Sequence, residues 1–369
     1  MRFTRRRLAL GALVALLVVV AIPAIWLGIK WNRALSDVNK MIVSPVELPT
    51  TPPELQPPAA DTPGDTADGG AAAVEPTAVP APDGAMNILL LGTDGRGGDD
   101  AESVRTDTIV WVHLDGRTDH VSMLSFPRDL WVNIPGFGKN KINAAYSIGE
   151  RRIGAGYGPA LLKKTVSELT GLPIDHFVLI NFQGFKKVID TVGGIYIDVP
   201  KTIDDDKYPM DEHPGDVRTM KIHFDPGRQL MDSDRALIYA RTRHQDSDFG
   251  RNQRQQQVLM AIFDRVREQG LLSQLTNLDQ YTGALSDYVR TDISRSQMLS
   301  LASMGSHLSP ESIQRYSIGP TMVAEGREPV AENQRAYVLL LTDRKALKQM
   351  VSQMVDPTLA TAGGEPVQN

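Results

Sequence analysis

The chain has 369 residues and a net charge of −5, enough material for one large domain or two small ones. It contains no cysteine, so disulfides, thiol catalysis and cysteine-ligated zinc sites are excluded. The slightly acidic balance gives no reason to expect nucleic-acid binding, because the basic residues do not follow one long face.

The N-terminal residues predict a membrane anchor. Residues 8–29 form an uncharged apolar run, long enough to cross the roughly 30 Å hydrocarbon layer as a helix. Four arginines within residues 1–7 precede it, which favours a cytoplasmic N-terminus. A cleaved signal peptide is the alternative, but the run is longer than a usual signal core and no small-x-small site follows. We therefore expect a single-pass protein of the cell membrane whose folded part is extracytoplasmic.

A linker follows the predicted anchor. Residues 30–85 separate the anchor from the first strand, and their larger part, 44–84, is rich in Pro, Ala, Thr, Asp and Gly. Such a segment has too few large apolar residues to bury a core and is expected to be an extended tether. Residues 86–355 are then expected to form one domain, and residues 356–369 a disordered tail.

Within the domain, strands and helices alternate. Apolar runs predict strands at 86–92, 108–114, 120–126, 176–182, 194–199 and 315–319, and helical patterns lie at 159–170, 185–193 and 253–269. The segment between the third strand and residue 142 is expected to be a loop, because it contains Pro135 and Gly136. This order predicts an α/β, α+β-like fold in which helices sandwich a mixed central sheet.

Charged residues follow the first strands. Asp94 comes directly after the first strand and Asp107 opens the second. If these strands are neighbours, the two carboxylates approach each other, which is unfavourable without a cation between them. Mg²⁺ prefers one or two carboxylates together with phosphate oxygens and water. The alternatives are an Asx turn at Asp94 and a surface ion pair between Arg105 and Asp107.

Further charges follow the third strand, where Arg128 and Asp129 are adjacent and Lys141 comes shortly after them. A solvated surface charge is the ordinary interpretation of a lone lysine. Charged loops after successive strands, all at one edge of the sheet, favour a common site instead.

The segment from Tyr239 to Gln257 contains the densest basic cluster of the chain. Arg241 and Arg243 would share a face of an extended segment, and the following helix would carry Arg251, Arg254 and Gln255 on one face. Arginine donors fit phosphate oxygens in pairs, so the cluster suggests a site for a polyanion such as pyrophosphate, with nearby aspartates holding the arginines. The alternative is a charged helix surface. The histidines show no metal-ligand spacing, and the acidic run 204–206 is expected to be solvated.

Six motifs in a fixed order resemble the LytR–CpsA–Psr family of membrane-anchored cell-wall glycopolymer ligases. They are GTDGR (92–96), RTDTI (105–109), SFPRD (125–129), IPGFGKNKINAAY (134–146), VGGIYIDVP (192–200) and RTRHQDSDFGRNQRQQ (241–256). The departures, such as Thr106 where the family often has serine, change no charged residue of these motifs.

The resemblance implies a hydrophobic pocket for a polyprenyl chain, with the pyrophosphate of the lipid at its mouth. It implies that Asp94 and Asp107 hold Mg²⁺, that Asp248 orients the arginines, and that Arg128 is catalytic, with Asp107 and Asp129 as alternative proton acceptors. The residues expected at the pyrophosphate are Arg105, Arg128, Lys141, Arg241, Arg243, Asp248, Arg251 and Gln255.

The implied activity is a phosphotransferase that moves a glycopolymer from a polyprenyl-pyrophosphate carrier to a peptidoglycan hydroxyl. A phosphodiester forms and polyprenyl phosphate is released. The sequence leaves open which glycopolymer is moved, teichoic acid or capsule among others. Two alternatives also remain: a polyprenyl-pyrophosphate phosphatase that uses water, and a non-catalytic regulatory protein that binds a polyprenyl lipid.

Overall fold

The computed structural model describes residues 38–49, 84–94, 105–118, 120–210, 218–243, 246–268, 286–294, 296–298, 300–301, 312–331 and 334–359. The predicted membrane helix at 8–29 and most of the predicted linker lie outside these residues. Within them, no helix is both long enough and apolar enough to cross a membrane. Of the predicted tail, residues 356–359 are described, and they include a short 3₁₀ turn at Pro357–Leu359.

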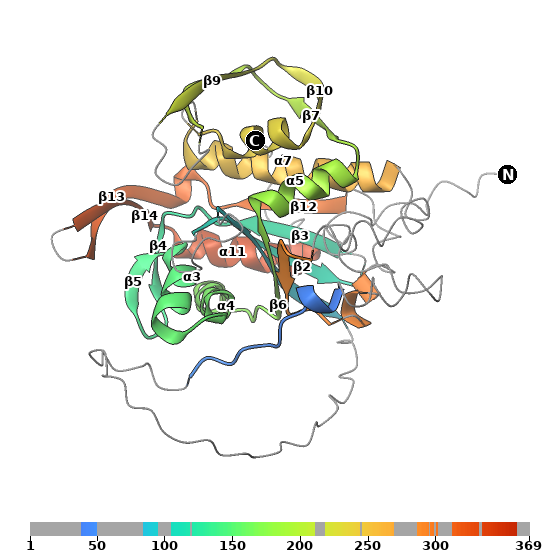
Figure 1. Cartoon of the computed structure of the whole chain (residues 1–369). Coiled ribbons are helices and arrows are strands. Elements are labelled where there is room, and N and C mark those ends of the chain that lie inside the picture. Colours follow the sequence, from blue (N-terminus) through green and yellow to red (C-terminus); the bar gives the residue numbers. More distant parts are fainter. Residues whose placement is uncertain are drawn as a thin grey trace, which may run out of the picture.

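A six-stranded mixed sheet forms the centre of the domain (Figure 1), as the sequence predicted. Strand β1 is parallel to β6 and β12 is parallel to β3, whereas the other neighbours are antiparallel. In spatial order the strands are β11 (Val289–Thr291), β6 (His176–Asn181), β1 (Ala85–Thr93), β2 (Thr106–Asp115), β3 (His120–Ser125) and β12 (Ile313–Ser317).

The sheet is buried on both faces. Along β1, Ile88 and Leu90 belong to one apolar cluster, and Leu89 and Leu91 belong to the other. Alternate side chains of a strand point to opposite faces, so a strand covered on both sides needs an unbroken apolar run. This explains why the run MNILLLG, and not a hydrophobic alternation, predicted this strand correctly.

Helices cover the two faces in two groups (Figure 1). One face carries α5 (Phe182–Thr191), α6 (Ser233–Arg241) and α7 (Ser247–Glu268). The other face carries α3 (Ala144–Ile148), the π-helical turn η1 (Gly149–Ile153), α4 (Tyr157–Thr170) and α11 (Arg344–Val355). The domain is therefore a three-layer sandwich.

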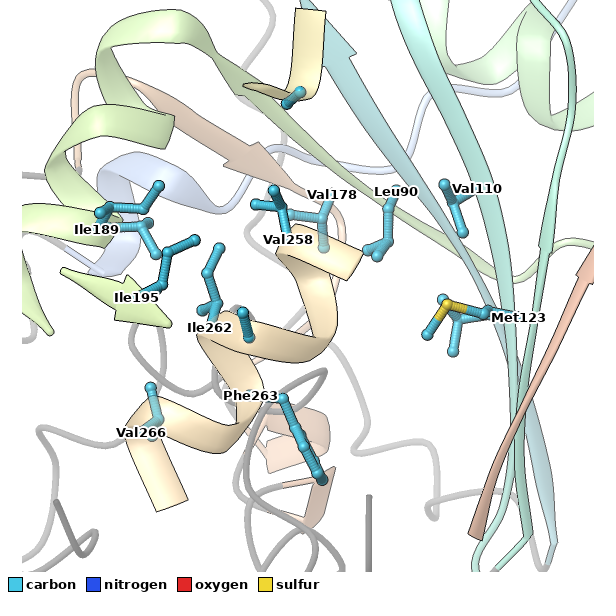
Figure 2. Packing of buried hydrophobic residues seen from close by; sticks show 14 of the residues in the cluster. Leu90, Val110, Met123, Val178, Ile189, Ile195, Val258, Ile262, Phe263 and Val266 are labelled. Carbon is cyan, nitrogen blue, oxygen red and sulfur yellow. The ribbon is translucent and has the colours of Figure 1, made fainter. Parts of the chain in front are cut away.

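Helix α7 is the main cover of the first face. Figure 2 shows Val258, Ile262 and Phe263 of this helix among side chains from the sheet and from the α5–β7 region. All three are almost fully buried. Fully burying one such side chain contributes about 1.5–3 kcal/mol, so this packing fixes the helix against the sheet. The N-terminal turns of α7, which carry the charged residues, are positioned by this packing.

Three smaller sheets extend the domain. The four-stranded one has the order β13 (Val323–Ala331), β14 (Gln334–Leu341), β4 (Leu130–Ile134) and β5 (Gly138–Lys141). The other two pair β7 (Ile195–Val199) with β10 (Gly227–Met231), and β8 (Ile203–Pro209) with β9 (Thr219–Phe224).

The prediction of a loop between residues 127 and 141 was wrong, because β4 and β5 form a hairpin there. Leu130, Val132 and Ile134 alternate as buried residues, which supports a strand that is half covered. Gly136 and Gly138 have φ angles of 80° and 75° and provide the tight turn. The glycines that suggested a loop are thus the turn of a hairpin.

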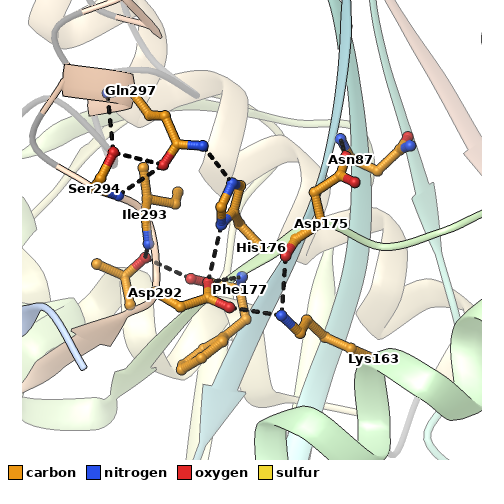
Figure 3. A network of polar contacts seen from close by, with 10 residues as sticks. Asn87, Lys163, Asp175, His176, Phe177, Asp292, Ile293, Ser294 and Gln297 are labelled. Atoms are coloured by element: carbon orange, nitrogen blue, oxygen red, sulfur yellow. Dashed lines mark hydrogen bonds and ion pairs between the residues drawn. The ribbon is translucent and has the colours of Figure 1, made fainter. Parts of the chain in front are cut away.

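A polar network joins three elements at the edge of the sheet where β6 begins (Figure 3). Lys163 Nζ donates to Asp292 Oδ2 at 2.6 Å, and the backbone N of Phe177 donates to Asp292 Oδ1 at 2.7 Å. Burial works to raise the pKa of Asp292, but the contacts of His176 and Lys163 outweigh it and leave that pKa below its usual value. The network ties α4 to the chain that follows β11.

Residues 38–49 lie against the domain, although they were expected to belong to the linker. Val38 and Met41 are buried in the cluster that contains α7. The backbone N of Val43 donates to the carbonyl O of Thr291 at 2.8 Å. This segment therefore belongs structurally to the folded domain.

Candidate functional site

The predicted charged residues meet at one edge of the central sheet. Strands β1, β3 and β6 end at this edge, and the antiparallel strand β2 begins there. Asp94 follows β1, Asp107 is the second residue of β2, and Arg128 follows β3. Strands β1 and β2 are direct neighbours, so the condition for an approach of Asp94 to Asp107 is met.

Arg128 lies among three carboxylates. Its Nη1 donates to Asp107 Oδ1 at 2.7 Å, and its Nε is 3.6 Å from an oxygen of Asp129 and 3.6 Å from an oxygen of Asp248. Burial works to lower the pKa of Arg128, but the negative charges of Asp107 and Asp248 outweigh it and raise that pKa. The guanidinium is therefore firmly charged and held in one orientation.

Asp129 and Asp248 form a carboxyl pair beside Arg128. Lys141 Nζ donates to Asp129 Oδ1 at 2.5 Å. Burial works to raise the pKa of Asp129, but the hydrogen bonds from Lys141 and Asp248 leave it below its usual value. For Asp248, burial is the main effect and raises the pKa, and the neighbouring Asp129 raises it further. The pair therefore takes up a proton more readily on Asp248 than on Asp129.

Arg251 is the buried arginine of the site, with a side chain only 4% exposed. Its Nη1 is 3.0 Å from Asp248 Oδ1, but its Nε and Nη2 have no acceptor among the described residues, and neither has Nε of Arg128. A buried donor without a partner costs about 1–3 kcal/mol. Burial lowers the pKa of Arg251. Arg128 and Arg251 both line the apolar cavity of the domain, so an anion bound there would lie against two guanidinium groups, as in a phosphate site.

Arg254, three residues further along α7, has a different role. Its side chain is 5% exposed, and every donor group is used: Nη1 contacts Asp246 at 2.6 Å, Nε donates to the carbonyl O of Tyr239 at 3.0 Å, and Nη2 donates to the carbonyl O of Thr242. Arg254 therefore ties the chain after α6 to α7. Sequence spacing alone did not separate this structural arginine from Arg251.

Arg128 and Arg251 line an apolar cavity. Its volume of about 360 Å³ is within the range of small-molecule sites. It lies between the sheet and helices α5–α7, and its apolar wall includes Leu90, Val178, Phe185, Leu237, Val258 and Ile262. Six of the predicted site residues line it: Asp107, Arg128, Arg241, Arg243, Arg251 and Gln255. The predicted hydrophobic pocket is thus present and has a strongly cationic rim.

Arg241 forms part of this rim through aromatic contacts. Its guanidinium lies 4.4 Å from the ring centre of Phe182, and its Nη1 donates to the hydroxyl of Tyr208 at 3.1 Å. Such cation–π contact stabilises a charged arginine without neutralising it. Gln255 Nε2 lies 3.5 Å from the carbonyl O of Ala240, which places its amide over the same wall.

Arg105 is exposed and does not line the cavity. Its backbone N donates a hydrogen bond to Asp94 Oδ1 at 2.8 Å. Conversely, the wall contains Asp205, Lys207 and Tyr208 of β8, which the sequence did not indicate. The expectation that the run 204–206 is solvated was wrong for Asp205. This residue is buried and accepts a hydrogen bond from Thr242 Oγ1 at 2.7 Å, because alternation along β8 turns it inward.

Asp94 and Asp107 are suitable protein ligands for a divalent cation that takes its other ligands from phosphate oxygens and water. Burial raises the pKa of Asp94, and the negative charge of Asp107 raises it further, although the hydrogen bond from Arg105 N opposes both. This repulsion indicates two neighbouring carboxylates that a cation would relieve. In the part of the chain that the structure describes, no group of three His, Cys, Asp or Glu residues could hold a metal by itself. The pair therefore suits Mg²⁺, which accepts few protein ligands when phosphate oxygens and water complete its shell.

The domain thus combines a mixed sheet, an apolar cavity and a cavity rim that contains arginine and aspartate side chains. The family model described as "LytR_cpsA_psr family" matches residues 60–355. The chain belongs to this family.

Two curated relatives illustrate the similarity. The polyisoprenyl-teichoic acid–peptidoglycan teichoic acid transferase TagU of Oceanobacillus iheyensis is 37% identical over 219 residues, which are 59% of this chain and 62% of the relative. The corresponding TagV of Bacillus subtilis is 36% identical over 243 residues, 63% of this chain and 56% of the relative. The matches thus span less than two thirds of the length of these curated relatives.

Solved structures share the fold. The crystal structure of B. subtilis TagV has a TM-score of 0.55 and 30% identity, and the match covers 74% of this chain and 98% of that one. A structure of TagT bound to LIIa-WTA has a TM-score of 0.54 and 26% identity, covering 73% of this chain and 89% of the other. These matches agree with the mixed sheet and helical layers described above.

Proposed function

We propose that the protein is a phosphotransferase that moves a glycopolymer from a polyprenyl-pyrophosphate carrier to a hydroxyl of peptidoglycan. The observation that carries the proposal is the apolar cavity whose rim contains Arg128 and Arg251 with three unpartnered donors. The cavity offers an apolar wall to the lipid tail, and the guanidinium groups at its rim offer hydrogen-bond donors to a pyrophosphate. The relatives TagU and TagV are polyisoprenyl-teichoic acid–peptidoglycan teichoic acid transferases, which supports teichoic acid as the class of glycopolymer.

The proposed reaction is a displacement at phosphorus. A peptidoglycan hydroxyl oxygen attacks the phosphorus attached to the glycan. The bond from that phosphorus to the bridging oxygen breaks, and the bridging oxygen leaves with its electron pair as part of polyprenyl phosphate. The product is a phosphodiester. Arg128 and Arg251 stabilise the charge that develops on the phosphoryl oxygens, as fixed cations do in phosphoryl transfer.

The hydroxyl proton needs an acceptor near Arg128. Asp107 is bonded to Arg128 and belongs to the proposed cation site, so it is the less suitable of the two candidates. Asp129 lies beside Asp248, whose raised pKa makes it a stable position for a proton. We therefore assign the acceptor role to the Asp129–Asp248 pair, with Lys141 holding Asp129 in place.

Mg²⁺ is the proposed cofactor, with Asp94 and Asp107 as its protein ligands. When bound, the ion would neutralise charge on the pyrophosphate and so favour the departure of polyprenyl phosphate as the leaving group. The apolar run at 8–29 and its preceding arginines support membrane anchoring with the domain outside the cytoplasm. Such an anchor would keep the cavity near the lipid substrate.

Transfer is tested with the full chain in detergent, a short-chain polyprenyl-pyrophosphate disaccharide, peptidoglycan oligomers and Mg²⁺. Mass spectrometry should detect a conjugate with the wild type and little or none with Arg128→Ala. Release of phosphorylated glycan without conjugate would indicate a phosphatase. Tight binding of the lipid without turnover would indicate a binding protein. Either result would overturn the proposal.

A further inference from the structure

A two-stranded arm extends from the domain close to the proposed site. Strands β13 and β14 form it, and Figure 1 shows the arm projecting away from the helical layers. Only Leu339 and Leu340 of β14 pair with β4, so the preceding residues of β14 pair with β13 alone. The described residues of the arm line no part of the apolar cavity. The arm therefore has no role in holding the lipid tail.

The register of the arm places Tyr337 near the start of β4, where Arg128 and Asp129 lie. Leu339 is opposite Leu130, and its backbone N donates to the carbonyl O of Asp129 at 2.9 Å. Tyr337 is two residues earlier in β14, on the same face of the strand as Leu339 and level with Arg128. Burial raises the pKa of Tyr337 to about 12, together with a hydrogen bond to Glu325 and the negative charges of Asp248 and Asp129. The tyrosine thus lies within electrostatic reach of the groups assigned to proton transfer.

The surroundings of Tyr337 suit a sugar. The residue is 41% exposed, which is unusual for a large aromatic side chain in this domain. Its strand neighbour Arg327 and its hydrogen-bond partner Glu325 are also exposed and supply donors and acceptors around the ring. A pyranose has an apolar face that packs on an aromatic ring, and a rim of hydroxyls that binds such polar groups.

We infer that the β13–β14 arm is the acceptor subsite, in which Tyr337 packs against a sugar of the peptidoglycan strand while Glu325 and Arg327 bind its hydroxyls. This inference rests on the proposed function. The lipid and pyrophosphate are proposed to occupy the cavity and its rim, whereas Tyr337 does not line the cavity and lies two residues before Leu339, whose backbone N donates to the carbonyl O of Asp129. An incoming hydroxyl must reach the Asp129–Asp248 pair, so a sugar platform on this side serves the acceptor and not the donor.

The test measures transfer by the full chain in detergent while the acceptor and donor concentrations are varied separately. Tyr337→Ala should raise the KM for peptidoglycan oligomers about tenfold and leave the KM for the donor lipid unchanged. Tyr337→Phe retains the ring and should stay within about threefold of the wild type. Tyr196 provides a matched control, because it is 40% exposed on β7, and Tyr196→Ala should change neither constant.

An unchanged acceptor KM in Tyr337→Ala, or a raised donor KM instead, would overturn the inference. Urea unfolding of each variant shows whether the fold is intact, and Tyr337→Ile, which retains a strand-forming residue, repeats the test if Tyr337→Ala is unstable. Direct binding of a fluorescent peptidoglycan oligomer without donor separates the two proposals. If the wild type binds the oligomer through Tyr337 but forms no conjugate, the proposed transfer is wrong. The inference that the arm binds the acceptor sugar then still holds.

Discussion

Replacing Arg251 should remove ligand binding with little loss of stability, in contrast to Arg254. Both residues are on α7, and their side chains are 4% and 5% exposed. Breaking a buried ion pair costs about 3–5 kcal/mol. In Arg251→Met this cost is opposed by the removal of two buried donors without acceptors, at about 1–3 kcal/mol each. The two terms nearly cancel, so the free energy of unfolding should change by less than about 2 kcal/mol.

Arg254→Met has no such compensation. Its three hydrogen bonds are lost and the half-buried carboxylate of Asp246 remains without its partner. The expected loss is about 4–6 kcal/mol, because the bonds come from a charged group and a buried pair is broken. Urea unfolding followed by circular dichroism measures both values. Equal destabilisation of the two variants would show that the donors of Arg251 are already satisfied and would refute the reasoning.

The same pair of variants separates structure from binding. Pyrophosphate with Mg²⁺ should stabilise the wild type against unfolding, by about 2.7 kcal/mol at a concentration of 100 Kd. Arg251→Met should lose this stabilisation, since two of the three unpartnered donors belong to Arg251. A variant that keeps full stabilisation by pyrophosphate would remove Arg251 from the proposed site.

Three further predictions concern the metal, the fold and pH. Asp94→Asn should abolish the enhancement of pyrophosphate binding by Mg²⁺ and leave the metal-free affinity within about threefold, as measured by calorimetry. Lys163→Met should destabilise the fold by about 3–5 kcal/mol by stranding buried Asp292, while pyrophosphate binding is retained. Burial, with the nearby His120, lowers the pKa of His113 to about 4, so below about pH 6.5 the unfolded chain binds a proton that the folded chain does not. Wild-type stability should therefore fall as pH decreases from about 6.5 to 4, by up to about 1.4 kcal/mol per pH unit, and the fall should be smaller in His113→Gln.

The sequence predicted the central sheet because burial on both faces requires continuous apolar runs, and β1, β2 and β3 have them. It also predicted that Asp107 and Arg128 lie at one edge, since strands that alternate in direction bring such loops together. The β13–β14 arm was not predicted. Its first strand contains Gly326 and Pro329, which favour a loop, whereas the apolar run 336–341 of its second strand is a strand pattern that was missed.

The site was predicted less completely than the sheet. Arg251 and Arg254 look equivalent in the sequence, and only the positions of Tyr239, Thr242 and Asp246 show that Arg254 is fully bonded. The inward direction of Asp205 depends on the register of β8 with β9, which a short acidic run does not reveal. Long-range packing decides these cases, and local patterns contain no information about it.

The fate of the donor phosphorus distinguishes a transferase from a phosphatase. The full chain, given lipid donor, peptidoglycan oligomers and Mg²⁺, is sampled over time, and mass spectrometry quantifies the conjugate, polyprenyl phosphate and free phosphorylated glycan. We expect a conjugate that contains one bridging phosphate and forms in equal amount to polyprenyl phosphate. Polyprenyl phosphate that accumulates with free phosphorylated glycan, and without conjugate, would contradict this expectation.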